Sequence, residues 1–240
     1  PPACLKTVMH VSVVVATLNE EENLTLCLES LRHQWHPAHE IIVADGHSID
    51  RTVSIAESLA DKVVFAPKRT ISAGRQTGAI AAEGELLVFC DADAYYPPHW
   101  LASLVSAFFR PEVVCAQGKL LVKDPTSLEH AFASHVAPWY FKAALKIGVP
   151  TGACSNLAVR KKAFIRAGGF NTDLVTAEDV DLQKRLLAFG ENVFVEGAEA
   201  YVSARRIRKW GYGKYVGFHV KNWMRYAMGF PPKQKYEPIR

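Results

Sequence analysis

The chain has 240 residues, of which 49% are hydrophobic and 22% are charged, as in ordinary globular proteins rather than disordered ones. Five widely spaced Cys without C-x-x-C or Cys/His ligand spacing argue against a disulfide framework or a zinc site, and favour a reducing compartment. No apolar run reaches the length of a membrane-spanning helix, and we expect no signal peptide at the start.

The net charge of +4 is unevenly distributed along the chain. From Ala204 to Arg240 there are ten Lys/Arg against one Glu, which leaves 18 basic and 23 acidic residues in Pro1–Ser203. Eight of the aromatic residues also lie in this final stretch. We therefore divide the chain into a body, residues 1–203, and a basic, aromatic segment, residues 204–240.

Short apolar runs alternate with helical patterns over the first 110 residues. Strands are predicted at His10–Ala16, Ile41–Ala44, Lys62–Ala66 and Glu85–Cys90. Helices are predicted after Thr17–Glu20, with Asn19 and Glu22 forming a capping box, then from Asp50 to Leu59, over Ile71–Ala82, and from Pro98 to Phe109. This alternation predicts an α/β fold with a mainly parallel sheet flanked by helices.

The second half of the chain predicts shorter elements. Strands are expected at Val113–Val122, Leu157–Val159, Val193–Val195 and Ala200–Ser203, and helices at Ser127–Ile147 with a kink at Pro138, Lys161–Ala167 and Ala177–Phe189. No G-x-G-x-x-G follows the first strand and no G-x-x-x-x-G-K-[ST] occurs, which argues against a dinucleotide oxidoreductase and a P-loop enzyme.

Two carboxylates, Asp91 and Asp93, directly follow the apolar run Leu86–Cys90. If the strand geometry persists, both side chains point the same way into the crevice where α/β sheets bind ligands. Hard oxygen ligands suit Mg²⁺ or Mn²⁺, which usually carry phosphate oxygens as further ligands. The pattern recurs at Asp179-Val180-Asp181, and the alternative is a pair of solvated turn residues.

Five motifs in order resemble the family 2 inverting glycosyltransferases of the GT-A fold. They are Thr17-Leu18-Asn19-Glu20, Asp45-Gly46-x-Ser48-x-Asp50, Gly74-Arg75-x-x-Gly78, Asp91-x-Asp93 and Glu178-Asp179. The similarity covers roughly Val11–Ser203. Within the family, the chain resembles polyprenyl-phosphate (dolichyl-phosphate) mannosyltransferases and small cellulose-synthase-like enzymes. Gly152–Asn156 and Gly168–Phe170 resemble family loops on the donor-sugar and acceptor side.

The resemblance implies roles for particular residues. Asp45 would contact the base or ribose of a nucleotide, with Thr17 and Glu20 beside the same pocket; Asp45 alone also suits an Asx turn, and Glu20 a helix N-terminus. Arg75 would hold a phosphate or base edge, unless it is a surface arginine. Asp91 and Asp93 would hold Mn²⁺ or Mg²⁺, Asp93 directly and Asp91 through a water or the nucleotide sugar.

Asp179 is the candidate general base, which takes the proton of the acceptor hydroxyl in an inverting reaction. Asp181 is its nearest competitor, although it lies about 200° further round the predicted helix. Acids in a first helical turn also complement the helix dipole, so Glu178, Asp179 and Asp181 have a structural alternative.

Two departures from the family pattern stand out. No late His lies near Val202–Ser203 to complete a metal site, and the Q-x-x-R-W sequence of processive members is absent, so single sugar addition is favoured over polymer synthesis. Arg205 and Arg206 occupy that region as candidate phosphate ligands.

The basic segment mixes aromatic and cationic residues over Tyr212–Met228, including Tyr215, Phe218, Trp223 and Tyr226. Such helices lie on anionic membranes. A final helix that packs back on the body is the alternative, and we expect no nucleic-acid partner although the composition would suit one.

The resemblance implies a metal-dependent inverting sugar transferase, with GDP-mannose as the first choice of donor and a UDP-sugar as the other, because the sequence itself does not separate GDP from UDP. The acceptor would be lipid-linked, such as a polyprenyl phosphate or a lipid-linked oligosaccharide, at the cytoplasmic face of the cell membrane. Transmembrane helices are expected beyond Arg240 in the natural chain. The alternatives are a sugar-nucleotide nucleotidyltransferase, which would want a Gly-rich basic loop after the first strand, and a non-enzymatic basic membrane-binding module.

Overall fold

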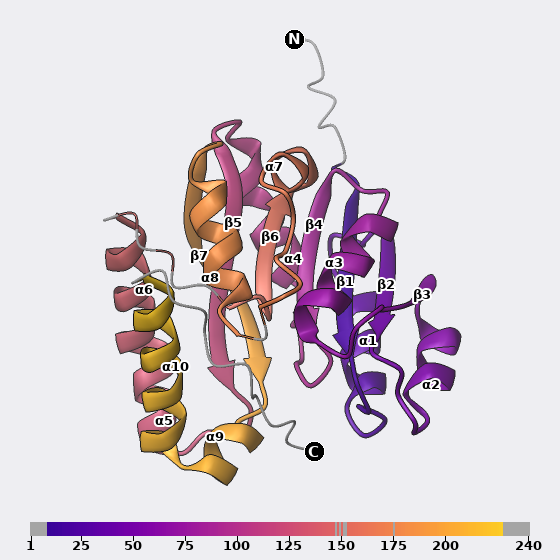
Figure 1. The fold of residues 1–240 in the computed structure, drawn as a ribbon, viewed down its shortest axis with the longest axis horizontal. Coiled ribbons are helices and arrows are strands. Elements are labelled where there is room, and N and C mark those ends of the chain that lie inside the picture. Colours follow the sequence, from indigo (N-terminus) through magenta and orange to yellow (C-terminus); the bar gives the residue numbers. More distant parts are fainter. Residues whose placement is uncertain (1–8, 147, 149, 151–152, 175, 228–240) are drawn as a thin grey trace.

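One mixed sheet with helices on both faces forms the body of the protein in a computed structural model, which describes residues 9–146, 148, 150, 153–174 and 176–227 (Figure 1). The strands are β1 Val11–Thr17, β2 Glu40–Asp45, β3 Lys62–Phe65, β4 Leu86–Asp91, β5 Val113–Val122, β6 Asn156–Arg160 and β7 Glu191–Val202. Their order in the sheet is β3-β2-β1-β4-β6-β5-β7. Only β6, among the described strands, runs antiparallel to its neighbours, so the α/β fold with a mainly parallel sheet is confirmed.

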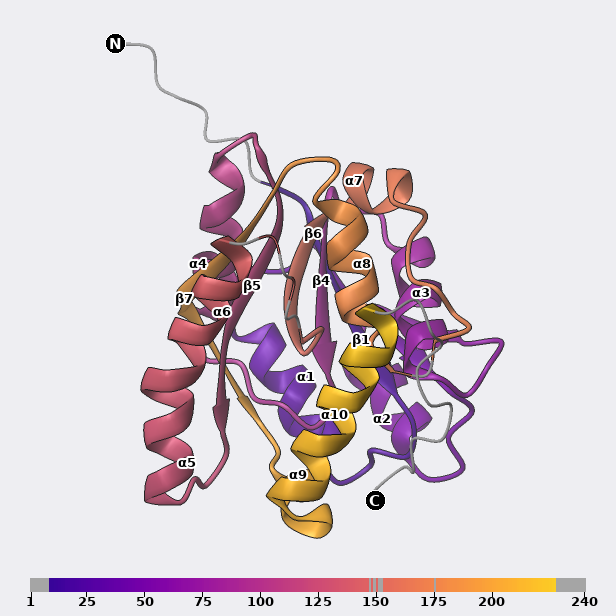
Figure 2. The same ribbon diagram turned by 60° about the vertical axis from the view of Figure 1, so that its left-hand side comes forward.

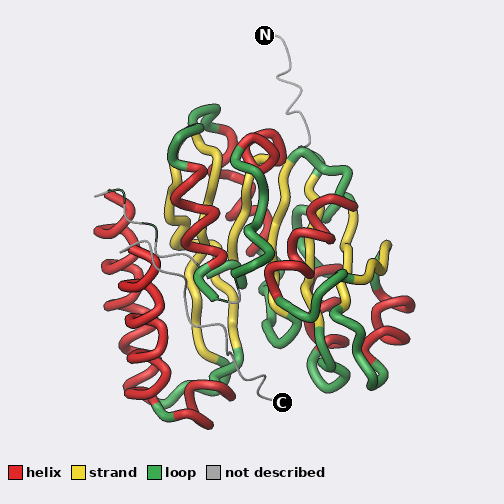
Figure 3. Tube along the Cα trace, viewed as in Figure 1, coloured by secondary structure: helices red, strands yellow, loops and turns green. Residues whose placement is uncertain are grey.

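The helices alternate with these strands (Figure 3). They are α1 Leu24–Arg32, α2 Thr52–Leu59, α3 Ile71–Ala81, α4 Trp100–Ser106, the 3-10 turn η1 Ala107–Phe109, α5 Ser127–Ala131, the π-helical turn η2 Phe132–Val136, α6 Ala137–Lys146, α7 Lys161–Arg166, α8 Glu178–Leu186, α9 Arg205–Trp210 and α10 Tyr212–Ala227. No helix within the described residues is long and apolar enough to cross a bilayer.

Two hydrophobic clusters hold the layers together, one on each face of the sheet. Alternate residues of β1 divide between them, with Val13 in one and Val14 in the other, because successive strand side chains point to opposite faces. The first cluster contains residues of α1, α2 and α4, and the second contains residues of α3, α7 and α8. The strands buried on both faces account for the continuous apolar runs of the sequence.

The carboxyl ends of β1, β2, β4, β5 and β7 meet at the lower edge of the sheet in Figure 1. Parallel strands point in the same direction, so their carboxyl ends lie at one edge of the sheet even where the strands are far apart in the sequence. Ligands of open α/β sheets bind at such edges. Topology therefore brings together the polar residues that follow β1, β2 and β4.

The capping box expected at the start of α1 is wrong. Asn19 adopts a left-handed backbone with φ of 52°, and its side chain accepts a hydrogen bond from Ile49 N at 2.8 Å. Asn23 precedes the helix instead, without a side-chain cap. Asn19 thus ties the loop after β1 to the loop after β2, a use of Asn that left-handed geometry allows. Asp50 was expected to cap α2. The helix begins at Thr52, and the Asp50 carboxylate accepts hydrogen bonds from both Thr52 N and Thr52 Oγ1.

β7 is one strand of 12 residues rather than two short ones. Its pairing with β5 shifts from Gly118↔Val195 to Lys119↔Glu199, so that Glu196–Ala198 form a bulge. A Cβ at position 118 would lie 2.3 Å from the Ala198 carbonyl oxygen, so the bulge requires glycine there. This bulge interrupts the apolar pattern from which two strands were predicted.

The helix expected at Ser127–Ile147 is interrupted before Pro138. Ala137 N donates to the Phe132 carbonyl five residues back, which is the widened turn of a π-helix. Proline lacks the N–H that would continue the regular ladder, so the predicted irregularity is confirmed one turn upstream of the ring.

Candidate active site

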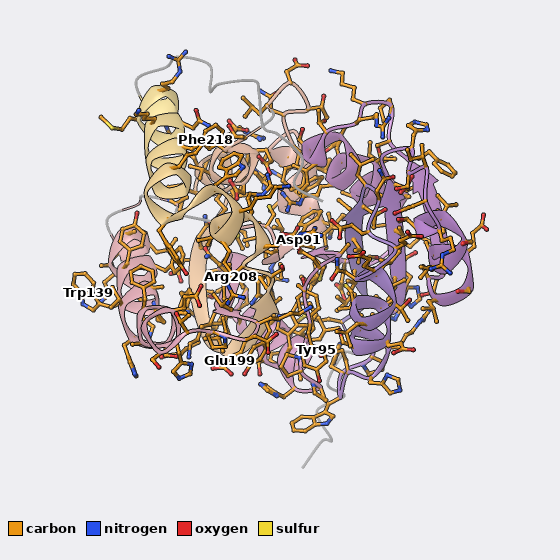
Figure 4. All side chains as sticks on the ribbon, turned by 90° about the horizontal axis from the view of Figure 1, so that it is seen from below. Asp91, Tyr95, Trp139, Glu199, Arg208 and Phe218 are labelled. Carbon is orange, nitrogen blue, oxygen red and sulfur yellow. The ribbon has the colours of Figure 1, made fainter. Side chains whose placement is uncertain are left out.

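Acidic side chains gather at the carboxyl edge of the sheet, seen end-on in Figure 4, where Asp91 lies near the centre. β4 ends at Asp91, and a turn closed by Ala94 N to the Asp91 carbonyl at 3.2 Å carries Asp93. The strand therefore ends one residue later than predicted, and strand alternation does not extend to Asp93. Both carboxylates nevertheless lie close enough to interact electrostatically.

Asp45, at the end of β2, is fully buried and already hydrogen-bonded. Its carboxylate accepts from Thr17 Oγ1 at 2.9 Å, from Ser48 N at 2.7 Å and from Ser48 Oγ at 2.6 Å. These bonds join the ends of β1 and β2 and shape the loop between them. Asp45 and Thr17 therefore meet as the motifs predicted, and their contact with a nucleotide stays a prediction.

Arg75 is a buried bridge rather than a surface residue. Its side chain is 3% exposed, donating from Nη2 to Asp91 Oδ1 and from Nη1 to Glu178 Oε1, each at 2.7 Å. Gly74 and Gly78 allow α3 to approach the sheet, since a Cβ at position 78 would lie 2.3 Å from Val14 Cγ1. The Gly74-Arg75-x-x-Gly78 motif therefore inserts a guanidinium between β4 and α8.

Asp93 faces a second arginine, which comes from α9. Arg205 Nη2 lies 3.2 Å from Asp93 Oδ2 and also bonds Glu20 Oε1. Burial and the nearby Asp91 together raise the pKa of Asp93 to about 6, although the Arg205 guanidinium opposes the rise. Lys123 Nζ, at the end of β5, donates to the Asp93 carbonyl oxygen at 2.9 Å.

This pair of carboxylates suits a divalent cation. Asp91 and Asp93 supply the hard oxygen atoms that Mg²⁺ and Mn²⁺ prefer, and a cation would relieve the repulsion and desolvation that raise the pKa of Asp93. The described residues contain no group of three metal-ligating side chains, so phosphate oxygens and waters would have to complete the coordination. Arg205 holds Asp93 through an ion pair that such a cation would compete with.

Asp179 lies in the first turn of α8, beside Glu178 and near Arg75. Burial raises the pKa of Asp179, and the Arg75 guanidinium opposes that rise. Asp181 is turned to a different partner, since its Oδ2 accepts from Arg185 Nε at 3.0 Å. The geometry thus separates the two candidate bases as their spacing on the helix predicted, and it leaves Asp179 beside the carboxylate cluster.

The described part of the basic segment contacts the body. Arg205 reaches the acidic cluster, Arg208 Nη2 donates to the Asp124 carbonyl at 2.7 Å, and Asn222 Nδ2 donates to Thr176 Oγ1 at 3.1 Å. Figure 2 shows α10 below α8, with the upper end of α10 near the lower end of α8. These contacts match the alternative of a final helix packed on the body. Arg206, the other expected phosphate ligand, lies 6.0 Å from the Trp210 ring.

Some expectations fall outside the described residues. These are the side chains of Tyr215, Trp223 and Tyr226, the loop residue Gly152, and everything after Ala227.

Sequence reasoning missed two residues of the site and the function of a third. Lys123 had no signal, because a lysine at a strand end is common. Ser48 lies in a quoted motif, yet only the fold shows that its hydroxyl and N–H both bind Asp45. Glu178 was noted beside Asp179, but its bond to Arg75 spans 103 residues of sequence.

Comparisons with known proteins agree with this geometry. The family model described as "Glycosyl transferase family 2" matches residues 12–168. A putative glycosyltransferase, EpsH of Bacillus subtilis, is 35% identical over 100 residues, covering 40% of this chain and 29% of the relative. A dolichol-phosphate mannosyltransferase of Pyrococcus furiosus is 34% identical over 105 residues, covering 41% of this chain and 30% of that relative.

A solved structure gives the fold a direct counterpart. The mannosyltransferase PcManGT of Pyrobaculum calidifontis, in complex with GDP-Man and Mn²⁺, superposes with a TM-score of 0.70 at 22% identity, covering 96% of this chain and 66% of that one. The chain spans about a third of the length of the first curated relatives that it matches. The fold is that of GT-A glycosyltransferases, and the chain belongs to glycosyl transferase family 2.

Proposed function

We propose that this glycosyltransferase moves a sugar, with inversion, from a nucleoside-diphosphate donor to a lipid-linked acceptor, and that it depends on Mn²⁺ or Mg²⁺. The observation that carries the proposal is the arrangement of Asp91 and Asp93 at the end of β4, with Asp179 joined to them through Arg75 and Glu178. The cation needs carboxylate ligands and the acceptor hydroxyl needs a general base, and this cluster supplies both.

Each residue has a distinct task in this reaction. Asp91 and Asp93 would hold the cation, which supplies Lewis-acid stabilisation of the leaving diphosphate when it is bound. Asp179 takes the proton from the acceptor hydroxyl as that oxygen attacks the anomeric carbon. Thr17, Glu20 and Asp45 line the side toward the nucleotide. Arg205 and Arg206 contact the phosphates once Arg205 leaves Asp93.

Mannose from GDP-mannose is our first choice of donor. It is supported by PcManGT, whose structure contains GDP-Man and Mn²⁺, and by the Pyrococcus dolichol-phosphate mannosyltransferase. Dolichyl-phosphate substrates are also named for relatives from Methanococcus voltae and Haloferax volcanii. These names support a polyprenyl-type acceptor. We place the reaction at the cytoplasmic face of a membrane, with residues 1–203 as the catalytic domain and 204–240 as the membrane-proximal segment.

Family membership decides against both alternatives given above. A nucleotidyltransferase or a non-enzymatic basic module would not match a family 2 glycosyltransferase model over 157 residues, 12–168.

A thermal-shift panel tests the choice of donor. GDP, UDP and their sugars would each be added with Mn²⁺ and with EDTA, and GDP-mannose with Mn²⁺ should raise the Tm most. A larger shift with a UDP-sugar would replace the donor and leave the reaction class intact. Equal Tm values across the whole panel would overturn the proposed function.

A further inference from the structure

The outer face of η2 and α6 carries large apolar side chains in solvent. Phe132, Val136, Trp139 and Tyr140 are 58%, 50%, 70% and 53% exposed. Counted from Phe132, the other three residues lie four, seven and eight positions further along, the spacing that forms one face of a helix. Figure 4 shows Trp139 at the periphery, pointing away from the body. Exposed apolar strips of this kind mark interaction surfaces, whereas singly scattered residues do not.

The opposite face of the same helix fixes this orientation. Ala133, Pro138 and Ala144 are buried, and the Phe141 ring stacks on Phe194 with centroids 5.8 Å apart. Lys142 Nζ bonds Glu196 Oε2 at 2.5 Å on β7. Apart from Phe141, the residues that face the protein are small, whereas Phe132, Val136, Trp139 and Tyr140 face outward, the reverse of an ordinary surface helix.

Cationic residues border the apolar strip. Lys146 lies on α6 itself, and residues 205–227 contain seven Lys/Arg and no acid. This basic part meets α5 at Glu129, which Arg208 contacts at 3.3 Å and Tyr212 also contacts. Figures 1 and 4 place α6 and α10 on the same side of the molecule, toward β7.

A groove of about 560 Å³ lies beside this helical segment. His130 and Ala133, from the same helical segment, form one wall, and Leu26, Tyr95 and Tyr201 lie among its other lining residues. Lys123 lines the groove as well, and its Nζ donates to the Asp93 carbonyl. The groove therefore lies between the inner side of this helical segment and a lysine that contacts Asp93.

We propose that the outer face of η2–α6 is the surface on which the enzyme rests on an anionic lipid bilayer. The inference rests on the proposed function, because a lipid-linked acceptor requires the enzyme to reach the membrane. Trp and Tyr have an apolar body and a polar tip, which suits the headgroup region, and the bordering cations match anionic lipids. A second copy of this chain fits less well, since a two-fold contact would bring the same cationic borders together.

Vesicle sedimentation with a double variant, Phe132→Gln and Trp139→Gln, tests this surface. Both side chains are exposed, so the fold should survive, and binding to phosphatidylcholine vesicles containing phosphatidylglycerol should fall at least about tenfold. Trp35→Gln is the matched control, because Trp35 is 76% exposed but lies beside His99, remote from this helix in sequence. It should bind vesicles like the parent chain. Val136→Gln with Tyr140→Gln provides a second, independent pair.

Three results would overturn the inference. They are a parent chain that does not sediment with anionic vesicles, a double variant that sediments like the parent, and a double variant that instead loses a concentration-dependent self-association. Nucleotide-induced thermal shifts should be equal in parent, variants and control. Normal shifts with unaltered sedimentation reject the surface alone, whereas absent shifts in the parent reject the proposed function.

Discussion

Asp179 is suited to a proton-transfer role by its surroundings. Burial raises its pKa, so that its carboxylate is a stronger base than a solvated aspartate, while Arg75 keeps the ionised form accessible. Asp181 has a different partner, because Arg185 pairs with it in the same helix. Two acids of one residue type, two positions apart, therefore differ in what they can do.

Asp179→Asn should slow sugar transfer by on the order of 10²–10⁴, the usual range for a lost general base. Donor affinity should hardly change, because the amide keeps the side-chain volume and the cation ligands lie on β4. Turnover and donor Kd measured on the same preparations separate these effects. Asp181→Asn serves as the matched control, and a large loss of turnover there with normal turnover in Asp179→Asn would move the base to Asp181.

Asp93→Asn should make the protein more stable at neutral pH in EDTA while abolishing metal-dependent transfer. Burial raises the pKa of Asp93 from 3.8 to about 6, so the folded state holds the proton more tightly than the unfolded state. The ionised carboxylate therefore costs stability as the pH rises from about 4 through 6, and an uncharged amide avoids that cost.

The expected gain is roughly 1–3 kcal/mol, or a few degrees in Tm, and it is already net of the ion pair with Arg205, because the pKa of about 6 includes that charge. Calorimetric scans of parent and variant check this at neutral and at acidic pH. A lower Tm for the variant at neutral pH would show that the ion pair outweighs the desolvation of Asp93.

At the scale of elements, α3 connects the two halves of the site. Its glycines bring the helix close to β1, and Arg75 then joins the end of β4 to the start of α8. A small shift of α3 would move the cation ligands and the base relative to each other. The position of α3 therefore sets the distance between the cation ligands and the base, and that position depends on the absence of side chains at positions 74 and 78.

Arg75→Gln should move the acidic limb of the pH–rate profile to higher pH. Asp179 must be ionised to accept a proton, so the rate falls as the pH drops through its raised pKa. The Arg75 charge holds that pKa down, and its removal raises the pKa further. Profiles of kcat against pH for parent and variant measure the shift. An acidic limb at the same or a lower pH in the variant would show that Arg75 does not hold down the pKa of Asp179.

The strands were predictable because their burial on both faces leaves continuous apolar runs. β5 was predicted with its observed bounds, Val113–Val122. Elements shaped by distant partners were not predictable. Asn19 has the sequence of a cap but is held by the loop at Ile49, and the bulge at Glu196–Ala198 divides the pattern of β7.

The same division applies to the site. Asp45, Asp91 and Asp93 follow strand ends, so parallel topology brings them to one edge, as the sequence indicated. The pairing of Arg205 with Glu20 spans 185 residues, and nothing local in either segment indicates it. Arg75 was predicted as a ligand contact, whereas the fold uses its planar fork to bridge two carboxylates.

At the scale of the whole molecule, charge is separated between an acidic body and a basic final segment. In the described residues, α9 contacts the acidic cluster and α10 contacts the loop before α8. The described part of this segment therefore contacts both the catalytic edge and the loop that precedes α8.

Removing Tyr212–Arg240 deletes six Lys/Arg and one Glu but keeps Arg205, Arg206 and Arg208. Binding to anionic vesicles should weaken and lose most of its dependence on salt, because each cation near such a surface contributes about 1 kcal/mol. Nucleotide binding should persist. Sedimentation at low and high salt, together with calorimetry, checks both points. Loss of nucleotide binding would instead indicate that α10 holds the loop at Thr176 in place.

The central claim is that the β4 carboxylates bind the donor diphosphate through a divalent cation. Titration calorimetry of GDP and UDP into the full chain, in Mn²⁺ and then in EDTA, tests it most directly. The preferred nucleotide should bind at least about tenfold more tightly in Mn²⁺, a difference of ~1.4 kcal/mol. Equal affinity in Mn²⁺ and in EDTA would contradict the claim, and would assign the phosphates to Arg205 and Arg206 instead.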